Sequence, residues 1–329
     1  MALRKLLREE HGKTRKLWEE VFTEDTPEFL DYYYTVKTAE NEIYVVEEDG
    51  EIRSMLHLNP YTMQIGERTY QTHYIVAVAT EEAYRRRGYM AKLLEQATDD
   101  MRRNGEPFTF LMPAAEAIYY PHGFRFIYRQ RQKNVMGKKS KNLQLNVELA
   151  DEKDCEMLAD FANRILQERY EVYAKRDRHY YERLLQEVKS EDGGILLVKK
   201  EEKLLGFFSY GKGENYEIIE PLFWEICEEA FYHAVYMLTE DETTEVKCAG
   251  FWEEDTEEKP MIMAKVLDIP EMLKAVSAET LLGYPIPIGD LTSLVFGYLD
   301  IEEMDFPKEI KKQWKTAKPL SKVFLNEIV

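Results

Sequence analysis

The tetrapeptide "RRRG", residues 85 to 88, stands between an apolar segment and an apolar amphipathic segment. Three neighbouring guanidinium groups repel one another unless an anion lies among them. Glycine removes the side chain that would keep an anion away from the backbone. A helix N-terminus offers unpaired N–H groups and about half a positive charge. This succession of residue types is typical of a site for a phosphate-bearing ligand.

A run of arginines alone is more often a solvated charged surface, so its position along the chain decides the interpretation. "IVAVAT" (75–80) predicts a buried strand that ends just before the loop. The segment after the loop predicts a helix that ends at Asn104-Gly105. Its apolar face consists of Met90, Leu93, Leu94, Ala97 and Met101. Strand, arginine loop and helix in direct succession favour the phosphate site.

The surrounding segments predict an α/β sandwich of roughly 130 residues. Apolar residues at helical spacing from Leu3 to Phe22 predict one opening helix, and a second begins after Pro27. Glu48-Asp49-Gly50 predicts the turn of a hairpin between two strands. Beyond the arginine helix, "FTFLMPA" predicts a strand, "AAEAIYY" a short helix, and Gly123 a turn into a last strand.

Residues 135–144 are polar, basic and without periodicity, which predicts a linker. Beyond it, residues 195–210 repeat the hairpin pattern of residues 43–58, which indicates an internal duplication, although hairpins are common enough to coincide by chance. The second copy has no arginine-glycine loop. The charged stretch 253–259 predicts a surface loop, and the remainder mixes strands with one helix. At about 70 residues this remainder has too thin a core to stand alone, so we expect it to pack on the other units.

The overall composition limits the partners of such a site. The chain has 329 residues and a formal net charge of −18, which argues against a nucleic-acid or anionic-membrane binder and favours a cationic small molecule. The three cysteines are widely spaced and suggest reduced thiols in the cytosol, with no metal site. We find no signal peptide and no stretch of about 20 apolar residues that would span a membrane.

The segment "VATEEAYRRRGYMAKLL" resembles the acetyl-coenzyme A signature of the GNAT N-acetyltransferases. Together with "AAEAIYYPHGF", it is similar to the Eis (enhanced intracellular survival) branch of that superfamily. The resemblance implies tandem α/β GNAT-like units with mixed sheets and a sterol-carrier-like α+β domain at the end. The implied boundaries are 1–140 for the first unit, 141–260 for a degenerate second unit and 261–329 for a short third unit.

The resemblance also implies which residues hold acetyl-coenzyme A. Backbone groups of Val78, Ala79 and Thr80 would meet the pantetheine arm, although Val78 and Ala79 can equally be plain strand core. The pyrophosphate would lie among Arg85, Arg86, Arg87, Gly88, Tyr89, Met90 and Ala91. Met90 departs from the small residue that the signature has there. The sequence does not choose among the three arginines.

Tyr119 matches the general acid of the family, which protonates the leaving thiolate. Tyr120 and Tyr74 are rivals for this role, and His122 is read as a turn residue. The family's general base is the C-terminal carboxylate, here that of Val329. The apolar tail "KVFLNEIV" predicts a segment drawn into the protein, with a purely structural edge strand as the alternative. At a normal pKa of about 3.5 a terminal carboxylate is a weak base, so burial or a water relay would have to assist it.

The resemblance implies an acetyl-coenzyme A-dependent N-acetyltransferase. Its acceptor would be a primary amine of an aminoglycoside-like or polyamine-like cation, or of an exposed lysine. One alternative keeps the fold but moves a longer acyl group or an aminoacyl group from transfer RNA, although the acidic chain disfavours the latter. A carrier protein with an idle transferase site is the other alternative. A homo-oligomer, a hexamer in this family, is also expected.

Overall fold

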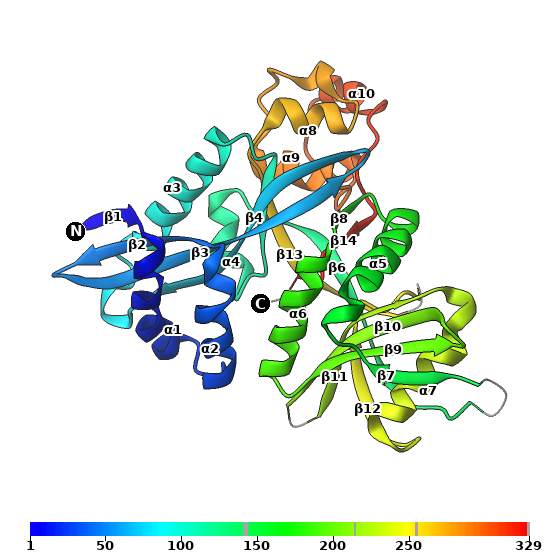
Figure 1. The fold of residues 1–329 in the computed structure, drawn as a ribbon. Helices are drawn as coiled ribbons and strands as arrows, with labels where there is room; N and C mark the ends of the chain where they lie inside the picture. Colours follow the sequence, from blue (N-terminus) through cyan, green and yellow to red (C-terminus); the bar gives the residue numbers. More distant parts are fainter. Residues whose placement is uncertain (141–143, 214, 254–255, 328–329) are drawn as a thin grey trace.

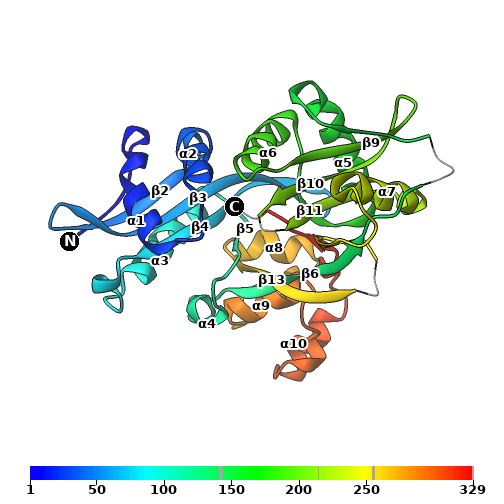
Figure 2. The same cartoon turned by 90° about the horizontal axis from the view of Figure 1, so that it is seen from below.

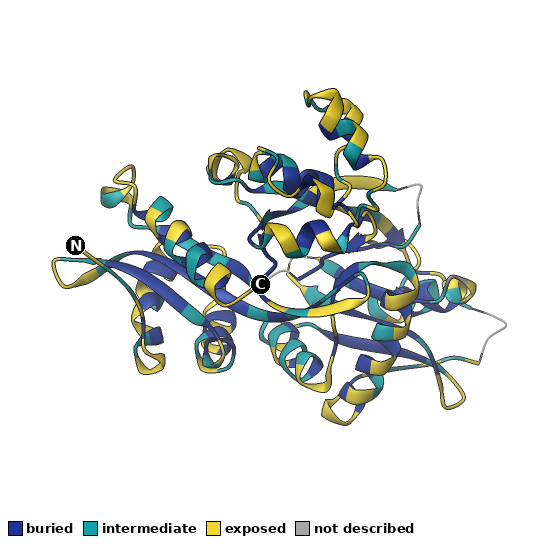
Figure 3. Cartoon of the chain, turned by 90° about the horizontal axis from the view of Figure 1, so that it is seen from above, coloured by how far each residue is buried: buried dark blue, intermediate teal, exposed yellow. Residues whose placement is uncertain are grey.

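One mixed β-sheet connects all parts of the chain that the structure describes. The computed structural model describes residues 1–140, 144–213, 215–253 and 256–327. The main strand order is β1-β2-β3-β4-β5-β13-β6-β12-β11-β10-β9-β7, with helices packed on both faces (Figures 1 and 2). The strands are largely buried, and the helices expose their outer faces (Figure 3). The mixed α/β fold expected from the sequence is confirmed.

The first half supplies one end of this sheet. Helices α1 and α2 cover one face of β2, β3 and β4, and α3 covers the other (Figure 2). The elements are β1 (Ala2–Lys5), α1 (Arg15–Val21), α2 (Pro27–Thr35), β2 (Glu42–Glu48), β3 (Glu51–Ile65), β4 (Arg68–Thr80), α3 (Tyr89–Arg103), β5 (Phe108–Leu111), α4 (Glu116–Tyr119) and β6 (Arg125–Met136).

The second half has a similar order of elements, but β8 lies between its first two helices and no α-helix lies between β12 and β13 among the described residues. Its elements are β7 (Asn146–Leu149), α5 (Cys155–Arg169), β8 (Val172–Ala174), α6 (Arg178–Ser190), β9 (Gly194–Lys200), β10 (Lys203–Lys212), β11 (Tyr216–Phe223), α7 (Glu228–Thr239), β12 (Glu245–Ala249) and β13 (Glu257–Val266). The pairings match as well: β7, β9, β10 and β11 are antiparallel neighbours, as are β1, β2, β3 and β4. In each half the next pair, β4 with β5 or β11 with β12, is parallel.

The two halves exchange their last strands. Strand β6 ends the first half but pairs with β12 of the second, and β13 ends the second half but pairs with β5 of the first. Strands β6 and β13 then pair antiparallel with each other from Glu257↔Gln132 to Ala264↔Arg125. The exchange covers an edge of each half-sheet that would otherwise expose unpaired N–H and C=O groups. Continuous backbone hydrogen bonding therefore joins the halves.

The hairpins of the two halves also share an irregularity. In the first half, Val46 pairs with Ser54 and Glu47 with Ile52, so Arg53 is an extra residue in β3. In the second half, Val198 pairs with Gly206 and Lys199 with Leu204, which leaves Leu205 extra in β10. These positions coincide when residues 43–58 are placed over residues 195–210. The predicted hairpins are confirmed, and their bulges match.

The C-terminal residues pack on the sheet rather than on a core of their own. They form α8 (Ile269–Ala275), α9 (Ile288–Val295), α10 (Lys308–Trp314) and the short strand β14 (Val323–Phe324). Leu291 and Trp314 share one hydrophobic cluster with Phe108 of β5 and Ile262 of β13. Strand β14 pairs with β8. The expectation that this part leans on the rest of the protein is confirmed, but the sequence wrongly suggested only one helix.

Several local expectations were wrong. Residues 2–5 form an edge strand, not the start of a helix, because Leu3 pairs with Val46 and Arg4 binds the carboxylates of Glu10 and Glu47. Residues 257–259, predicted as loop, begin β13 because their charged side chains face solvent while their backbone pairs with β6. Within the predicted linker, residues 135 and 136 end β6, and residues 141–143 lie outside the described ranges.

No helix in the described ranges is long and apolar enough to cross a membrane.

His57 on β3 is an ionisable group enclosed in the first-half core. Its ring is fully buried beside Trp18, and its Nδ1 lies 3.3 Å from the Tyr33 hydroxyl. Its Nε2 has no hydrogen-bond partner among the described residues. Burial lowers the pKa of His57 to about 3. Between that value and the unfolded pKa of about 6.5, the unfolded chain binds more protons, so stability rises with pH across this window.

We expect the substitution His57→Gln to flatten the acid side of the stability profile. From pH 6.5 to pH 4 the native protein should lose about 3 kcal/mol more unfolding free energy than the variant. Denaturant unfolding followed by circular dichroism at several pH values measures this difference. His179→Gln is the control, because that imidazole is about half exposed. Parallel profiles for the native protein and His57→Gln would contradict the assignment.

Candidate active site

Strands β4 and β5 meet at a single position and then diverge. They are parallel neighbours, and their only register pair in the described sheet is Tyr74↔Phe110. Strand β4 continues to Thr80, whereas β5 ends at Leu111. Parallel strands that separate toward their carboxyl ends leave an opening where a ligand can reach the backbone.

A β-bulge in β4 lies at this opening. Met55 pairs with Ala79 and His57 with Val76, so Ala77 and Val78 together oppose Leu56. Ala77 has a φ of 51°, in the left-handed region that a non-glycine residue rarely adopts. A bulge interrupts the ladder and releases backbone groups from pairing. The bulge frees backbone groups at Ala77 and Val78, whereas the Ala79 carbonyl accepts from Ser54 and the Thr80 carbonyl from Arg85. The predicted backbone contact of Val78, Ala79 and Thr80 with a ligand stays a prediction.

The side chains of the same residues point in different directions. Val78 packs against the cluster beneath α3, and Ala79 packs against the cluster beneath α1 and α2. The Thr80 hydroxyl lies 2.8 Å from that of Ser54. Val78 and Ala79 are thus both strand core through their side chains and neighbours of the opening through their backbone.

Gly88 caps the N-terminus of α3. Its φ of 77° is in the left-handed region, which favours glycine. A Cβ added there would meet nothing within 4 Å, so the space in front of it is open. Helix α3 has 15 residues, and the N–H groups of Tyr89, Met90 and Ala91 at its first turn have no acceptor within the helix.

The structure distinguishes the three arginines. Arg85 donates from Nε to the Thr80 carbonyl at 3.2 Å. Arg87 donates to the Ala83 carbonyl, and its guanidinium lies 4.4 Å from the centre of the Tyr84 ring. Arg86 is exposed, has a φ of 64°, and makes no side-chain hydrogen bond or ion pair with any described residue. Two arginines therefore hold the loop, and Arg86 remains available for an anion.

The next two side chains turn away from the loop. The Tyr89 ring is buried, and its hydroxyl donates to Glu48 in the β2–β3 hairpin. Met90 is half-buried and packs against the cluster beneath α3. Its bulk thus lies against the core, and the departure from a small residue leaves the loop surface open. Arg53, which stacks on Tyr84 at 4.5 Å and bonds Glu81 at 2.6 Å, was missed by the sequence analysis.

Tyr119 belongs to the same cluster as Val78 and Met90. It ends α4, its side chain is 6% exposed, and its ring centre lies 6.0 Å from that of Phe124. Burial alone raises the pKa of Tyr119 to about 12, so the hydroxyl stays protonated at neutral pH. The structure therefore brings this predicted acid to the α3 side of β4, near the bulge and the loop.

The alternative residues have other contacts. The Tyr74 hydroxyl is fully buried and accepts a hydrogen bond from the Met112 backbone. Tyr120 is about half exposed, and its ring lies 3.3 Å below the Arg125 guanidinium. Burial and the nearby Lys265 ammonium lower the pKa of His122. Val329, the predicted general base, lies outside the described residues.

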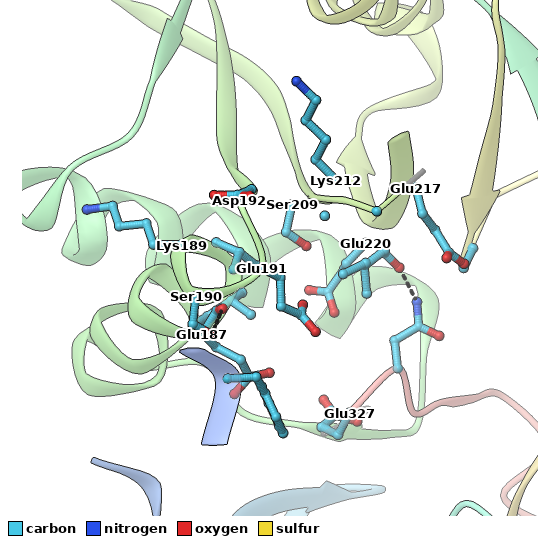
Figure 4. A pocket seen from close by; sticks show the side chains of 18 of the residues that line it. Glu187, Lys189, Ser190, Glu191, Asp192, Ser209, Lys212, Glu217, Glu220 and Glu327 are labelled. Carbon is cyan, nitrogen blue, oxygen red and sulfur yellow. Dashed lines mark hydrogen bonds between the residues drawn. The ribbon is translucent and has the colours of Figure 1, made fainter. Parts of the chain in front are cut away.

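A cavity of about 1300 Å³ lies between the two halves (Figure 4). Met112, which follows β5, and Tyr61 of β3 line it from the first half, together with residues of α2. Helix α6 and strands β10 and β11 line it from the second half, and Asn326 and Glu327 of the tail complete the wall. This cavity could not be predicted from the sequence, because its wall comes from many segments that lie far apart in the chain.

Carboxylates outnumber cationic groups in the cavity wall. The acidic residues are Glu28, Asp31, Glu187, Glu191, Asp192, Glu217, Glu220 and Glu327. The basic residues are Lys37, Arg183, Lys189, Lys212 and Lys247. Burial, followed by the charge of Glu187, raises the pKa of Glu191 to about 7. Such a wall favours a cation.

Residues 2–127 match the family model described as the acetyltransferase (GNAT) domain. A search of curated protein sequences gives no match. Among solved structures, a probable N-acyltransferase from Enterococcus faecalis V583 is similar with a TM-score of 0.71 and 16% identity, covering 84% of this chain and 75% of that chain. A GCN5-related N-acetyltransferase from Kribbella flavida gives a TM-score of 0.65 and 15% identity, covering 83% and 73%. Eis1 from Mycobacterium abscessus gives 0.60 and 13%, covering 84% and 76%.

Because these identities are below 25%, the similarity to solved structures supports the fold alone. The family model covers residues 2–127, which belong to the first half. The bulged strand, the arginine-glycine loop and α3 all lie within the matched residues. Residues 2–127 therefore form a GNAT acetyltransferase domain, and the chain as a whole has the α/β fold of the N-acetyltransferases to which it is similar.

Proposed function

We propose that the protein transfers an acetyl group from acetyl-coenzyme A to a primary amine of a cationic small molecule. The observation that carries this proposal is the arrangement at the end of β4. The bulge, the loop with its uncommitted Arg86, and Tyr119 all lie on one side of the sheet. The bulge suits the pantetheine arm of a thioester donor, the loop suits its diphosphate, and Tyr119 suits its leaving sulfur.

The donor would supply an activated acetyl group, and the loop would hold its phosphates. Backbone N–H groups at the start of α3 and the Gly88 cap would donate to phosphate oxygens. Arg86 would add charge-assisted hydrogen bonds. The bulge near Val78 would present backbone groups to the arm. Each of these contacts positions the donor without changing the fold of the loop.

The acceptor amine would approach from the cavity between the halves. The cavity reaches Met112, which directly follows β5. Its acidic wall would hold the amine in its ammonium form, and releasing one proton at pH 7 from a group of pKa about 10 costs roughly 4 kcal/mol. Orientation of the amine against the thioester would offset part of this barrier. The proton released by the ammonium group would pass to water. As the new C–N bond forms and the C–S bond breaks, Tyr119 would protonate the departing sulfur.

We further propose that the second half is a degenerate GNAT-like unit. Its similar element order, bulged hairpin and parallel β11–β12 pair support this proposal. It lacks an arginine-glycine loop before α7, so its role would be to form the acceptor wall. We also propose that the chain divides into units at 1–140 and 141–260 and a sterol-carrier-like unit at 261–329. Assembly into an oligomer is proposed as well.

A direct assay tests the function. Purified protein is incubated with acetyl-coenzyme A and a panel of mono-, di- and polyamines, while free thiol is followed. We expect thiol release that depends on the amine. Longer acyl-coenzyme A donors run in parallel decide which acyl group is preferred. Absence of release above background with every amine and donor would contradict the proposal.

We expect Gly88→Ala to weaken donor binding by about tenfold, because the methyl group would occupy the space in which phosphate oxygens approach the backbone. Calorimetric titration with coenzyme A measures the affinity. Gly105→Ala is a matched control: Gly105 follows the other end of α3, has a φ of 78°, and also has nothing within 4 Å of an added Cβ. Both variants carry the same backbone strain, so equal donor affinities would argue against the loop as the phosphate site.

We expect Tyr119→Phe to lower kcat by about 100-fold or more while donor affinity stays unchanged, because only the proton donor is lost. Steady-state kinetics and calorimetry measure the two quantities. Tyr120→Phe removes a hydroxyl from the adjacent, more exposed ring and should keep full activity. If Tyr119→Phe retains the native kcat, another group protonates the sulfur.

A further inference from the structure

Three buried polar atoms on the second-half side of the cavity have no hydrogen-bond partner among the described residues. They are the Ser209 Oγ, the Glu220 Oε1 and the Glu327 Oε2. These residues are 2%, 5% and 3% exposed, and all three line the cavity. An unpaired buried acceptor carries a desolvation cost of about 1–3 kcal/mol, more for a charged group. Ser209 and Glu220 face each other across β10 and β11, and Arg176 bridges Glu220 and Glu327, so the three oxygens belong to one region of the cavity wall.

A break in strand pairing places two of these atoms together. Ser209 of β10 pairs with Glu220 of β11, but Tyr210 pairs with Ile218, so Ile219 is an extra residue. The Ile219 carbonyl, released from the ladder, accepts a hydrogen bond from the Asn326 side chain at 3.1 Å. This bond brings the tail, and with it Glu327, beside the bulge. Figure 4 shows the Ser209 hydroxyl pointing toward the space between the Glu191 and Glu220 carboxyl groups.

The charges at this place do not balance. Arg176 is fully buried and donates to Glu220 at 2.9 Å and to Glu327 at 2.5 Å. One guanidinium therefore faces two carboxylates, which leaves one negative charge in a buried setting. Burial raises the pKa of Glu220, although Arg176 opposes this effect. A buried charge without a partner is unfavourable, so a cation that reaches this place would be held firmly.

The other cavity carboxylates extend the same negative region. Glu187 and Glu191 line the cavity from α6 and its C-terminal end. Three of the five cations in the cavity wall are already engaged: Lys37 lies 3.4 Å from Glu187, Arg183 bonds Glu40, and Lys247 bonds Glu217. Glu191 makes no ion pair with any described residue. The negative region therefore continues from the buried oxygens into the open cavity.

We propose that Ser209, Glu220 and Glu327, with Glu191 at the rim, form a subsite for an ammonium group remote from the amine that is acetylated. An ammonium group has three N–H donors, and the three unpaired oxygens are acceptors. Its single positive charge would neutralise the Arg176 cluster. The proposal rests on the proposed function for the choice of reaction, and it assigns the acceptor to the di- and polyamines. The subsite sits on the second half, which would select the acceptor.

Binding without a donor tests this subsite separately from catalysis. Hexamethylenediamine and hexylamine have the same carbon chain, but only the first has a second ammonium group. We expect the native protein to bind the diamine at least tenfold more tightly by calorimetry, with a larger rise in melting temperature. Because acetyl-coenzyme A is absent, a failure of the proposed acetyl transfer leaves this measurement intact.

Two variants and one control locate the effect. Ser209→Ala and Glu220→Gln should each reduce the preference for the diamine, Glu220→Gln by about tenfold. Glu217→Gln is the control, because Glu217 also lies on β11 and lines the cavity but is paired with Lys247 at 2.6 Å. If Glu220→Gln does not fold, Ser209→Ala still decides, since it removes no charge from Arg176. Equal affinities for the two amines in the native protein, or a preference unchanged in the variants, would overturn the subsite.

Discussion

The backbone pairing of β6 with β13 is the interaction on which the rest of the structure depends. It lies in the middle of the sheet and joins the last strand of each half to the other half. Without it, β5 and β12 would each present an unpaired edge. The pairing also fixes how the halves face each other, and so it sets the cavity between them. Neither half has a complete sheet of its own.

Each half of the sheet contains a β-bulge in the fourth strand of its antiparallel series, but the surroundings of the two bulges differ. In the first, the bulge in β4 lies beside an arginine-glycine loop and leaves an opening at the strand ends. In the second, the Ile219 carbonyl at the bulge in β11 accepts a hydrogen bond from Asn326, so the tail lies beside that bulge. The same backbone device therefore leaves main-chain groups at an opening in one half and fastens the tail in the other. This division agrees with a donor site in the first half and an acceptor wall in the second.

Local sequence signals predicted the parts of the fold that local forces determine. The turn at Asp49-Gly50, the helix from Tyr89 to Arg103 and the turn at Gly123 follow from spacing and backbone preference. The strand at residues 2–5 did not follow, because pairing with β2 overrides a helical pattern. The exchange of β6 and β13 has no local signal, since it depends on contacts between strands far apart in sequence.

The candidate site also has parts that local sequence predicts and parts that depend on contacts between distant segments. The arginine loop and Tyr119 could be found because one short segment each carries the pattern. The roles of the single arginines could not, since they depend on Tyr84, Thr80 and Ala83 as neighbours. The unpaired oxygens of Ser209, Glu220 and Glu327 come from three segments and become visible only when the tail is in place. For the acceptor, the acidic composition of the chain predicted only a positive charge.

The position of β13 has a consequence for synthesis on the ribosome. Strands β5 and β6 leave the ribosome early, but β13, which fits between them, is translated only after the rest of the second half. The nascent first half must therefore wait with an incomplete sheet and an apolar surface formed by Phe108 and Phe110. Because unfinished edges attract other chains, a chaperone that shields this region during translation would raise the yield of folded protein.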